Sequence, residues 1–219
     1  MTPEDLAARH PRLYHQTAPG AWASVRAQGL IPTAEMLHRL RLPPEQIDAL
    51  TRHPRPHTIH FLDTPFGQVE INDNRPLSHA ALSRCLDDGL SPQDWCAMLA
   101  ERVFFWADER RGLSRLLNAK MNRDRARDVL VIDTLSFATA ERPRIELSPI
   151  NSGSTIRKPA RRGLRTFTPM QDVADYRTWR GLRGKSDTVL KVVVPVMVTV
   201  APHVVEVRRY EGGTYTVID

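Results

Sequence analysis

Apolar and polar residues alternate along the chain with two different periods. Apolar residues three or four positions apart predict amphipathic helices, most clearly over residues 33–42 and 91–99. Residues 128–133 instead form a short, nearly continuous apolar run, which is typical of a central strand buried on both faces. Helical patterns dominate the first half of the chain, so the two periods together predict a mixed architecture.

Strands are expected to dominate the last third of the chain. Residues 188–200, 204–210 and 214–218 are rich in β-branched residues, and Gly212 and Gly213 between the last two stretches are typical of a hairpin turn. The 219 residues suit one hydrophobic core of ordinary size. We therefore predict a single α+β domain over residues 1–219.

The amino-acid composition indicates which partners and which cellular location to expect. The chain has 31 Lys and Arg against 25 Asp and Glu, and the net charge of +6 favours a nucleic-acid or nucleotide partner. No apolar run approaches the roughly 20 residues that cross a bilayer, so we expect no membrane partner. The two cysteines fall in predicted helices and no signal peptide is evident, so we expect reduced thiols and a cytoplasmic location.

The strongest candidate for a ligand site begins at residue 13. Leu13 and Tyr14 suit a buried strand, and the pattern then changes to a helix that Gly29 ends. His15 and Thr17 are two residues apart, so their side chains point to the same side of the strand and can both hydrogen-bond one ligand. The alternative is that they are polar residues at a strand end with no ligand.

Three motifs carry a resemblance to a known family. Tyr14-His15-x-Thr17, followed by a short helix that closes with Gly29-Leu30, resembles the opening of the ADP-ribosyltransferase fold in its diphtheria-toxin-like branch. That branch includes the poly(ADP-ribose) polymerases and the DarT toxins that modify DNA. The Phe-Phe-Trp run at 104–106 and the Ile-Glu-Leu-Ser-Pro-Ile-Asn-Ser-Gly segment at 145–153 are similar to an uncharacterised bacterial family regarded as distant transferase relatives.

The resemblance implies both a fold and a set of NAD contacts. The fold would be split antiparallel β-sheets with peripheral helices, and NAD would bind as substrate in the cleft between the sheets. In the family, the His and the residue two positions later hold the nicotinamide ribose and amide, an aromatic strand stacks on the nicotinamide, and an Arg contacts the phosphates. The matching residues are His15 and Thr17 with the adjacent Tyr14, then Phe104 or Trp106 with Phe105 pointing the other way, and Arg75.

The catalytic carboxylate is the point at which the sequence departs from the family. DarT-like enzymes carry a Glu on a late strand, where it stabilises the charge that develops on the ribose. The matching strand has Lys191 in place of Glu. Glu206 on the following strand is the first candidate, Glu146 is the second, and a site without activity is the remaining alternative.

A basic cluster follows the Asn-Ser-Gly loop. With no aromatic residue before Phe167, it suits contact with phosphates better than base stacking. A solvated loop is the alternative. The cluster consists of Arg157, Lys158, Arg161, Arg162 and Arg165.

These observations lead to one predicted function and two alternatives. The prediction is an NAD-dependent ADP-ribosyltransferase that modifies nucleic acid, DNA or RNA, as a DarT-like toxin or phage-defence effector with an antitoxin or immunity protein as partner. One alternative is a basic nucleic-acid-binding module with a vestigial NAD cleft, and the other is an NAD-dependent RNA 2′-phosphotransferase. His53, His57 and His60 are close together, but without Cys or a helical His-x-x-x-His motif we expect no metal site.

Overall fold

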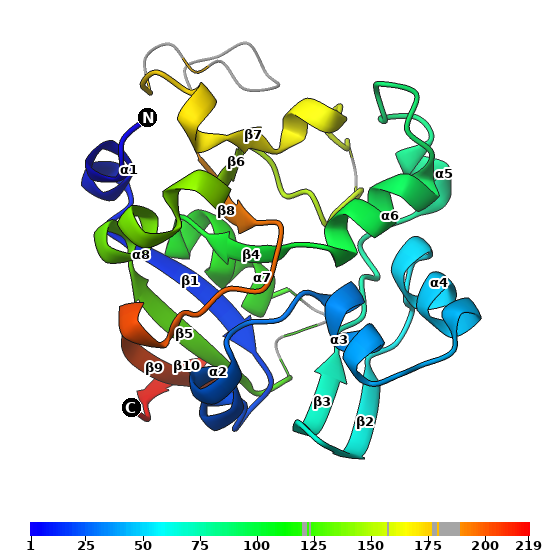
Figure 1. Ribbon diagram of the computed structural model, residues 1–219, viewed down its shortest axis with the longest axis horizontal. Helices are drawn as coiled ribbons and strands as arrows, with labels where there is room; N and C mark the ends of the chain where they lie inside the picture. Colours follow the sequence, from blue (N-terminus) through cyan, green and yellow to red (C-terminus); the bar gives the residue numbers. More distant parts are fainter. Residues whose placement is uncertain (120–121, 123, 157, 177–178, 180–188) are drawn as a thin grey trace.

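The computed structural model describes residues 1–119, 122, 124–156, 158–176, 179 and 189–219. Eight strands form one antiparallel sheet in the order β10-β9-β5-β1-β4-β8-β6-β7, and a separate hairpin pairs β2 with β3 (Figure 1). The strands of the large sheet are β1 (Arg12–Thr17), β4 (Val103–Trp106), β5 (Arg127–Asp133), β6 (Glu146–Ser148), β7 (Thr168–Pro169), β8 (Lys191–Val194), β9 (Val204–Glu211) and β10 (Thr214–Val217), and those of the hairpin are β2 (Ile59–Thr64) and β3 (Gly67–Ile71).

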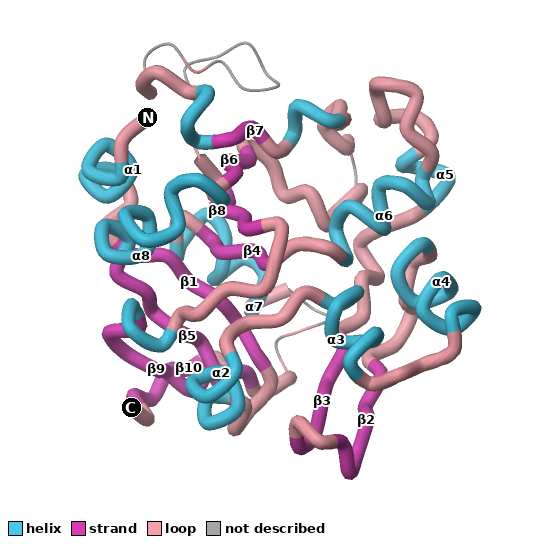
Figure 2. Tube along the Cα trace, viewed as in Figure 1, coloured by secondary structure: helices cyan, strands magenta, loops and turns pink. Residues whose placement is uncertain are grey.

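Short helices surround the sheet and confirm the predicted α+β class (Figure 2). The helix expected over residues 91–99 is α6, where Ser91 and Asp94 form a capping box and Pro92 occupies the first turn. The helices are α1 (Pro3–Arg9), α2 (Trp22–Gln28), α3 (Thr33–Arg39), α4 (Pro44–Arg52), α5 (His79–Leu82), α6 (Pro92–Ala100), α7 (Ser114–Leu117) and α8 (Thr134–Glu141). In the described part of the chain, no helix has both the length and the apolar character to cross a membrane.

The central strand β5 organises the core, as its apolar run predicts. Every residue of β5 except Asp133 is buried. On one face, Leu130 packs in a cluster with Leu6 of α1 and Phe137 of α8, and these two helices lie together beside the sheet in Figure 1. On the other face, Val129 packs with Leu117 of α7. Successive side chains of β5 therefore pack into two separate apolar clusters, one on each face of the sheet.

The large sheet consists of two halves with a weak seam between β1 and β4. Six registered pairs join β1 to β5, and four join β4 to β8. A single pair, Tyr14 with Trp106, joins β1 to β4. The expectation of two separate sheets is thus corrected to one continuous sheet whose halves part after this pair.

Gly29 ends α2 with a backbone that other residues rarely adopt. Its φ is +83° and its ψ is −179°, and a Cβ there would lie 2.6 Å from the Val198 carbonyl oxygen. Leu30 and Val198 form an isolated antiparallel bridge at this point. The close approach fixes where the chain leaves α2 and enters the segment that leads to α3.

Gly29→Ala is expected to lower the free energy of unfolding by about 3 kcal/mol, because it adds a backbone clash to an unfavourable φ. Gly20→Ala is the matched control, since Gly20 has a φ of +79° but no atom within 4 Å of the added Cβ. It should cost only about 1 kcal/mol. Equilibrium urea unfolding measures both, and equal losses would show that the contact with Val198 contributes nothing.

Candidate functional site

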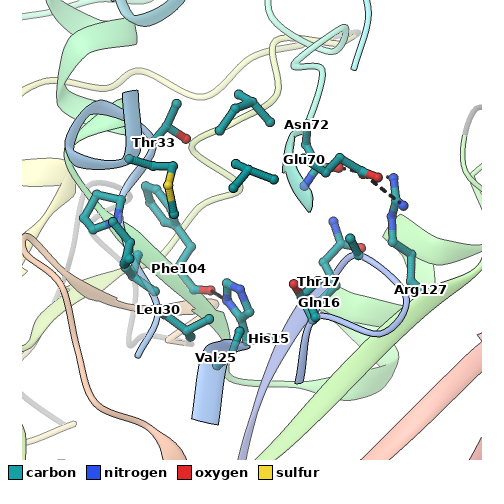
Figure 3. A pocket seen from close by; sticks show the side chains of 18 of the residues that line it. His15, Gln16, Thr17, Val25, Leu30, Thr33, Glu70, Asn72, Phe104 and Arg127 are labelled. Atoms are coloured by element: carbon teal, nitrogen blue, oxygen red, sulfur yellow. Dashed lines mark hydrogen bonds and ion pairs between the residues drawn. The ribbon is translucent and has the colours of Figure 1, made fainter. Parts of the chain in front are cut away.

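A cavity of about 910 Å³ opens where the two halves of the sheet part. Its lining comes from the end of β1, the segment from α2 to α3, strand β3, the end of α6 and strand β4 (Figure 3). The volume is at the upper end of the range for small-molecule sites. Segments far apart in the sequence therefore form one site at the seam.

His15 lies at this seam and connects its two sides. Its Nδ1 is 2.9 Å from the Phe104 carbonyl oxygen, and its ring lies 5.6 Å from that of Phe105. Because a carbonyl can only accept, Nδ1 carries the hydrogen and Nε2 of the neutral ring is an acceptor. Burial lowers the pKa of His15, and the bond to Phe104 opposes this more weakly. His15 is therefore a neutral acceptor in the lining of the cavity.

The other residues of the two motifs divide between the cavity and the core. Thr17, Phe104 and Trp106 line the cavity together with His15. Phe105 is fully buried in the main core, as predicted. Tyr14 does not line the cavity; it packs with Trp106 in the cluster that includes Leu117. Of the five residues in these two motifs that were expected to contact NAD, the cavity thus brings together four.

The loop after β1 is held by a buried carboxylate. Asp128 is fully buried on β5, opposite Thr17, and accepts a 2.7 Å hydrogen bond from the Gly20 backbone nitrogen. Its second partner is the guanidinium of Arg209 on β9. Because this carboxylate is compensated by a charge and by backbone hydrogen bonding, it can fix the loop at the mouth of the cavity.

A second carboxylate, Glu70 of β3, lines the cavity itself. Its Oε1 lies 3.1 Å from Nη1 of Arg127, and Arg127 also donates a 3.2 Å hydrogen bond to the Asn72 side chain (Figure 3). The Glu70 side chain is only 13% exposed, and within the described residues Oε1 has no well-directed hydrogen bond. Glu70 therefore lies in the lining of the cavity as a carboxylate that is ion-paired with Arg127.

Positive charge exceeds negative charge around the cavity. Among the described residues, five basic side chains line it, and its carboxylates are Glu70 and Asp73. Arg125 pairs with Asp73 at 2.7 Å. Arg55 donates to the carbonyl oxygens of Leu50 and Asn72, and no carboxylate pairs with it among the described residues. The excess favours an anionic ligand. The basic residues are Arg55, Arg102, Arg125, Arg127 and Lys191.

The two predicted catalytic acids lie outside the cavity. Glu206 is on β9, which β5, β1 and β4 separate from β8, and both its oxygens accept from Arg208, at 2.7 and 3.0 Å. Glu146 on β6 pairs with Arg102 at 2.8 Å. Neither side chain lines the cavity, so both assignments are corrected. Succession in sequence had suggested that β8 and β9 are neighbours, and the strand order shows that they are not.

Arg75, which was expected to contact the NAD phosphates, also lies outside the cavity. Its Nε donates to the Pro56 carbonyl at 3.0 Å, the side chain is 40% exposed, and it does not line the cavity. The cavity instead contains Arg55, which lies in the segment before β2 and gives no sequence signal of its own. A single Arg can be assigned to a site only after the loops are placed.

The basic cluster is smaller than the sequence suggests. Arg162 is 1% exposed and donates to the carbonyls of Ser152 and Ala160, so it cannot belong to an exposed surface. Arg161 is paired with Asp87, while Lys158 and Arg165 are exposed. Arg157 lies outside the described residues. The correction for Arg162 follows from its backbone bridge to Leu86, which brings this segment against the turn after α5.

The sequence matches one known protein family over most of its length. Residues 11–205 match a family of unknown function, DUF7002. The chain belongs to this family. No curated protein matches the sequence of this DUF7002 protein. Its family match runs from before β1 into β9, and therefore includes every residue that lines the cavity. Among the described residues, no three His, Cys, Asp or Glu side chains gather in a way that could hold a metal ion.

The titration of His15 tests this geometry. Its folded-state pKa is lowered, so the unfolded chain takes up a proton at a higher pH than the folded one, and the contribution of His15 to stability falls as the solution becomes more acidic. We expect long-range ¹H–¹⁵N spectra to show the Nδ1–H tautomer and a midpoint below the ordinary value of 6.5. A His15→Gln variant assigns the signals. An Nε2–H tautomer, or a midpoint above 6.5, would contradict the bond to Phe104.

Proposed function

We propose that this DUF7002 protein binds NAD in the seam cavity and transfers its ADP-ribose group to nucleic acid. The observation that carries the proposal is the convergence of His15, Thr17, Phe104 and Trp106 on one cavity with an excess of positive charge. These four residues belong to sequence motifs in two strands that share only one registered pair.

The chemistry of the lining suits the parts of NAD. The neutral His15 offers Nε2 as an acceptor for a ribose hydroxyl, and the Thr17 hydroxyl can both donate and accept. The faces of Phe104 or Trp106 suit a flat, cationic nicotinamide ring. Arg55, which no carboxylate neutralises among the described residues, suits the pyrophosphate.

Glu70 takes the role first sought at Glu206 and Glu146. In the transfer, the bond between C1′ of the ribose and the nicotinamide nitrogen breaks, its electron pair leaves with nicotinamide, and positive charge develops on the ribose until the acceptor attacks C1′. A carboxylate near that charge stabilises the transition state more than the ground state. Among the described residues, Glu70 is the glutamate that lines the cavity.

One set of incubations can identify the acceptor and distinguish ADP-ribose transfer from the RNA 2′-phosphotransferase reaction. The net charge of +6, with Lys158 and Arg165 exposed, supports a polyanionic acceptor. The number of arginines in the cavity also favours the RNA 2′-phosphotransferase alternative, which depends less on a glutamate. The protein is incubated with NAD and either DNA, RNA or 2′-phosphorylated RNA. Loss of the 2′-phosphate would indicate the RNA 2′-phosphotransferase reaction, because ADP-ribose transfer to nucleic acid does not remove it. Binding of nucleic acid without nicotinamide release would support a binding module.

His15→Ala should weaken NAD binding by about tenfold or more, since it removes the acceptor and the link to Phe104. Isothermal titration calorimetry measures the affinity. Glu206→Gln is the matched control and should bind as the parent does, because the Glu206 side chain does not line the cavity. Equal affinity in His15→Ala and the parent would remove His15 from the binding site.

Glu70→Gln should leave NAD affinity near that of the parent and lower nicotinamide release by roughly two orders of magnitude, the scale of losing one electrostatic stabiliser. Release is measured by chromatography with the most reactive nucleic acid present. Glu206→Gln should release nicotinamide at the parental rate. Full turnover in Glu70→Gln would show that the chemistry does not use this carboxylate.

A further inference from the structure

Lys191 begins β8 and lies on the floor of the cavity. In the register of the sheet it is opposite Trp106 of β4, and Nζ lies 4.5 Å from the Trp106 ring centroid and 5.0 Å from that of Phe104. Its residue exposure is 7%, yet it is part of the cavity lining. The amine is therefore enclosed by aromatic rings at the place where a ligand would lie.

No opposite charge accompanies this amine. Within the described residues, no carboxylate pairs with Lys191, and the charge that acts on it is that of Arg162, which has the same sign. Burial lowers the pKa of Lys191 from 10.5 to about 7, and Arg162 acts in the same direction. The ring faces favour the ammonium form and oppose this shift. Desolvation and a neighbouring cation are the two conditions that make a lysine nucleophilic near neutral pH.

The other cations of the cavity differ from Lys191 in what they can supply. Arg55, Arg102, Arg125 and Arg127 remain charged and contribute positive potential. An amine that reaches its uncharged form adds a nucleophile, which an arginine cannot. A lysine that served only to attract an anion would not need to be enclosed by two rings, where desolvation disfavours its charge.

We propose that Lys191 is a reactive amine that forms an imine with the carbonyl group of an anionic aldehyde or ketone bound in the cavity. The Nζ electron pair attacks the carbonyl carbon, and the oxygen accepts a proton to give a carbinolamine. Loss of water then leaves a carbon–nitrogen double bond, so one amine and one carbonyl give one imine and one water. The step needs no oxidant or reductant, and Arg55, which no carboxylate neutralises among the described residues, accounts for the anionic ligand.

This inference does not depend on the NAD proposal, because it concerns a different ligand chemistry at a different residue. It is also open to a direct test, since the chain has only four lysines, Lys120, Lys158, Lys185 and Lys191. Covalent labelling can therefore be assigned to one lysine by peptide mass mapping. The exposed Lys158 supplies a matched control.

The experiment uses pyridoxal 5′-phosphate as an aldehyde that carries a phosphate. The full-length protein is incubated at pH 7 with a limiting amount of the probe and reduced with borohydride, and the adduct is located by mass spectrometry. We expect one adduct, on Lys191, and about tenfold less labelling with pyridoxal, which lacks the phosphate. Lys158→Met should label as the parent does, whereas Lys191→Met and Lys191→Arg should lose the adduct.

The pH profile tests the same proposal without a variant. Labelling of Lys191 in the parent should rise with a midpoint near 7, the lowered pKa, and not near 10.5, the ordinary value for lysine. Adducts confined to the exposed lysines, or a Lys191 midpoint near 10.5, would overturn the proposal. Circular dichroism of both Lys191 variants shows whether lost labelling comes from lost folding. The pH profile of labelling in the parent protein does not depend on whether the variants fold.

Discussion

The seam between β1 and β4 is the constraint on which the site depends. The Tyr14–Trp106 pair is the single registered contact between the two halves of the sheet, whereas each seam strand is fully paired on its other side. Beyond it, the ladder cannot continue and backbone groups need other partners. The His15 side chain satisfies the Phe104 carbonyl, so the hydrogen bond that closes the seam also sets the tautomer of the ring that lines the cavity.

Charge is arranged differently at the wall and at the floor of this cavity. At the wall, Arg127 pairs with Glu70 and Arg125 with Asp73, which ties β3 and the loop after it to β5 and the chain before it. At the floor, Lys191 lies against aromatic rings and has no carboxylate partner among the described residues. Paired charges stabilise the position of the hairpin, whereas Lys191 takes part in no ion pair among the described residues.

Local sequence patterns were sufficient for several features. The apolar run at 128–133 predicted a central buried strand, and all of β5 but its last residue is buried. Strand alternation predicted that Phe105 would face away from Phe104 and Trp106, and the structure confirms it. These predictions were correct because side-chain direction in a strand follows from backbone geometry alone.

The tertiary structure decided which of the outward-facing groups meet. Glu206 belongs to a strand far from β8, Arg162 belongs to a basic cluster but is buried, and Glu70 and Arg55 reach the cavity without any motif to mark them. The sequence by itself determined the α+β class, several elements such as α6 and β5, and the His15–Thr17 pair. Strand order, loop placement and burial depend on contacts between distant residues, and periodicity along one segment carries no information about which other segment lies beside it.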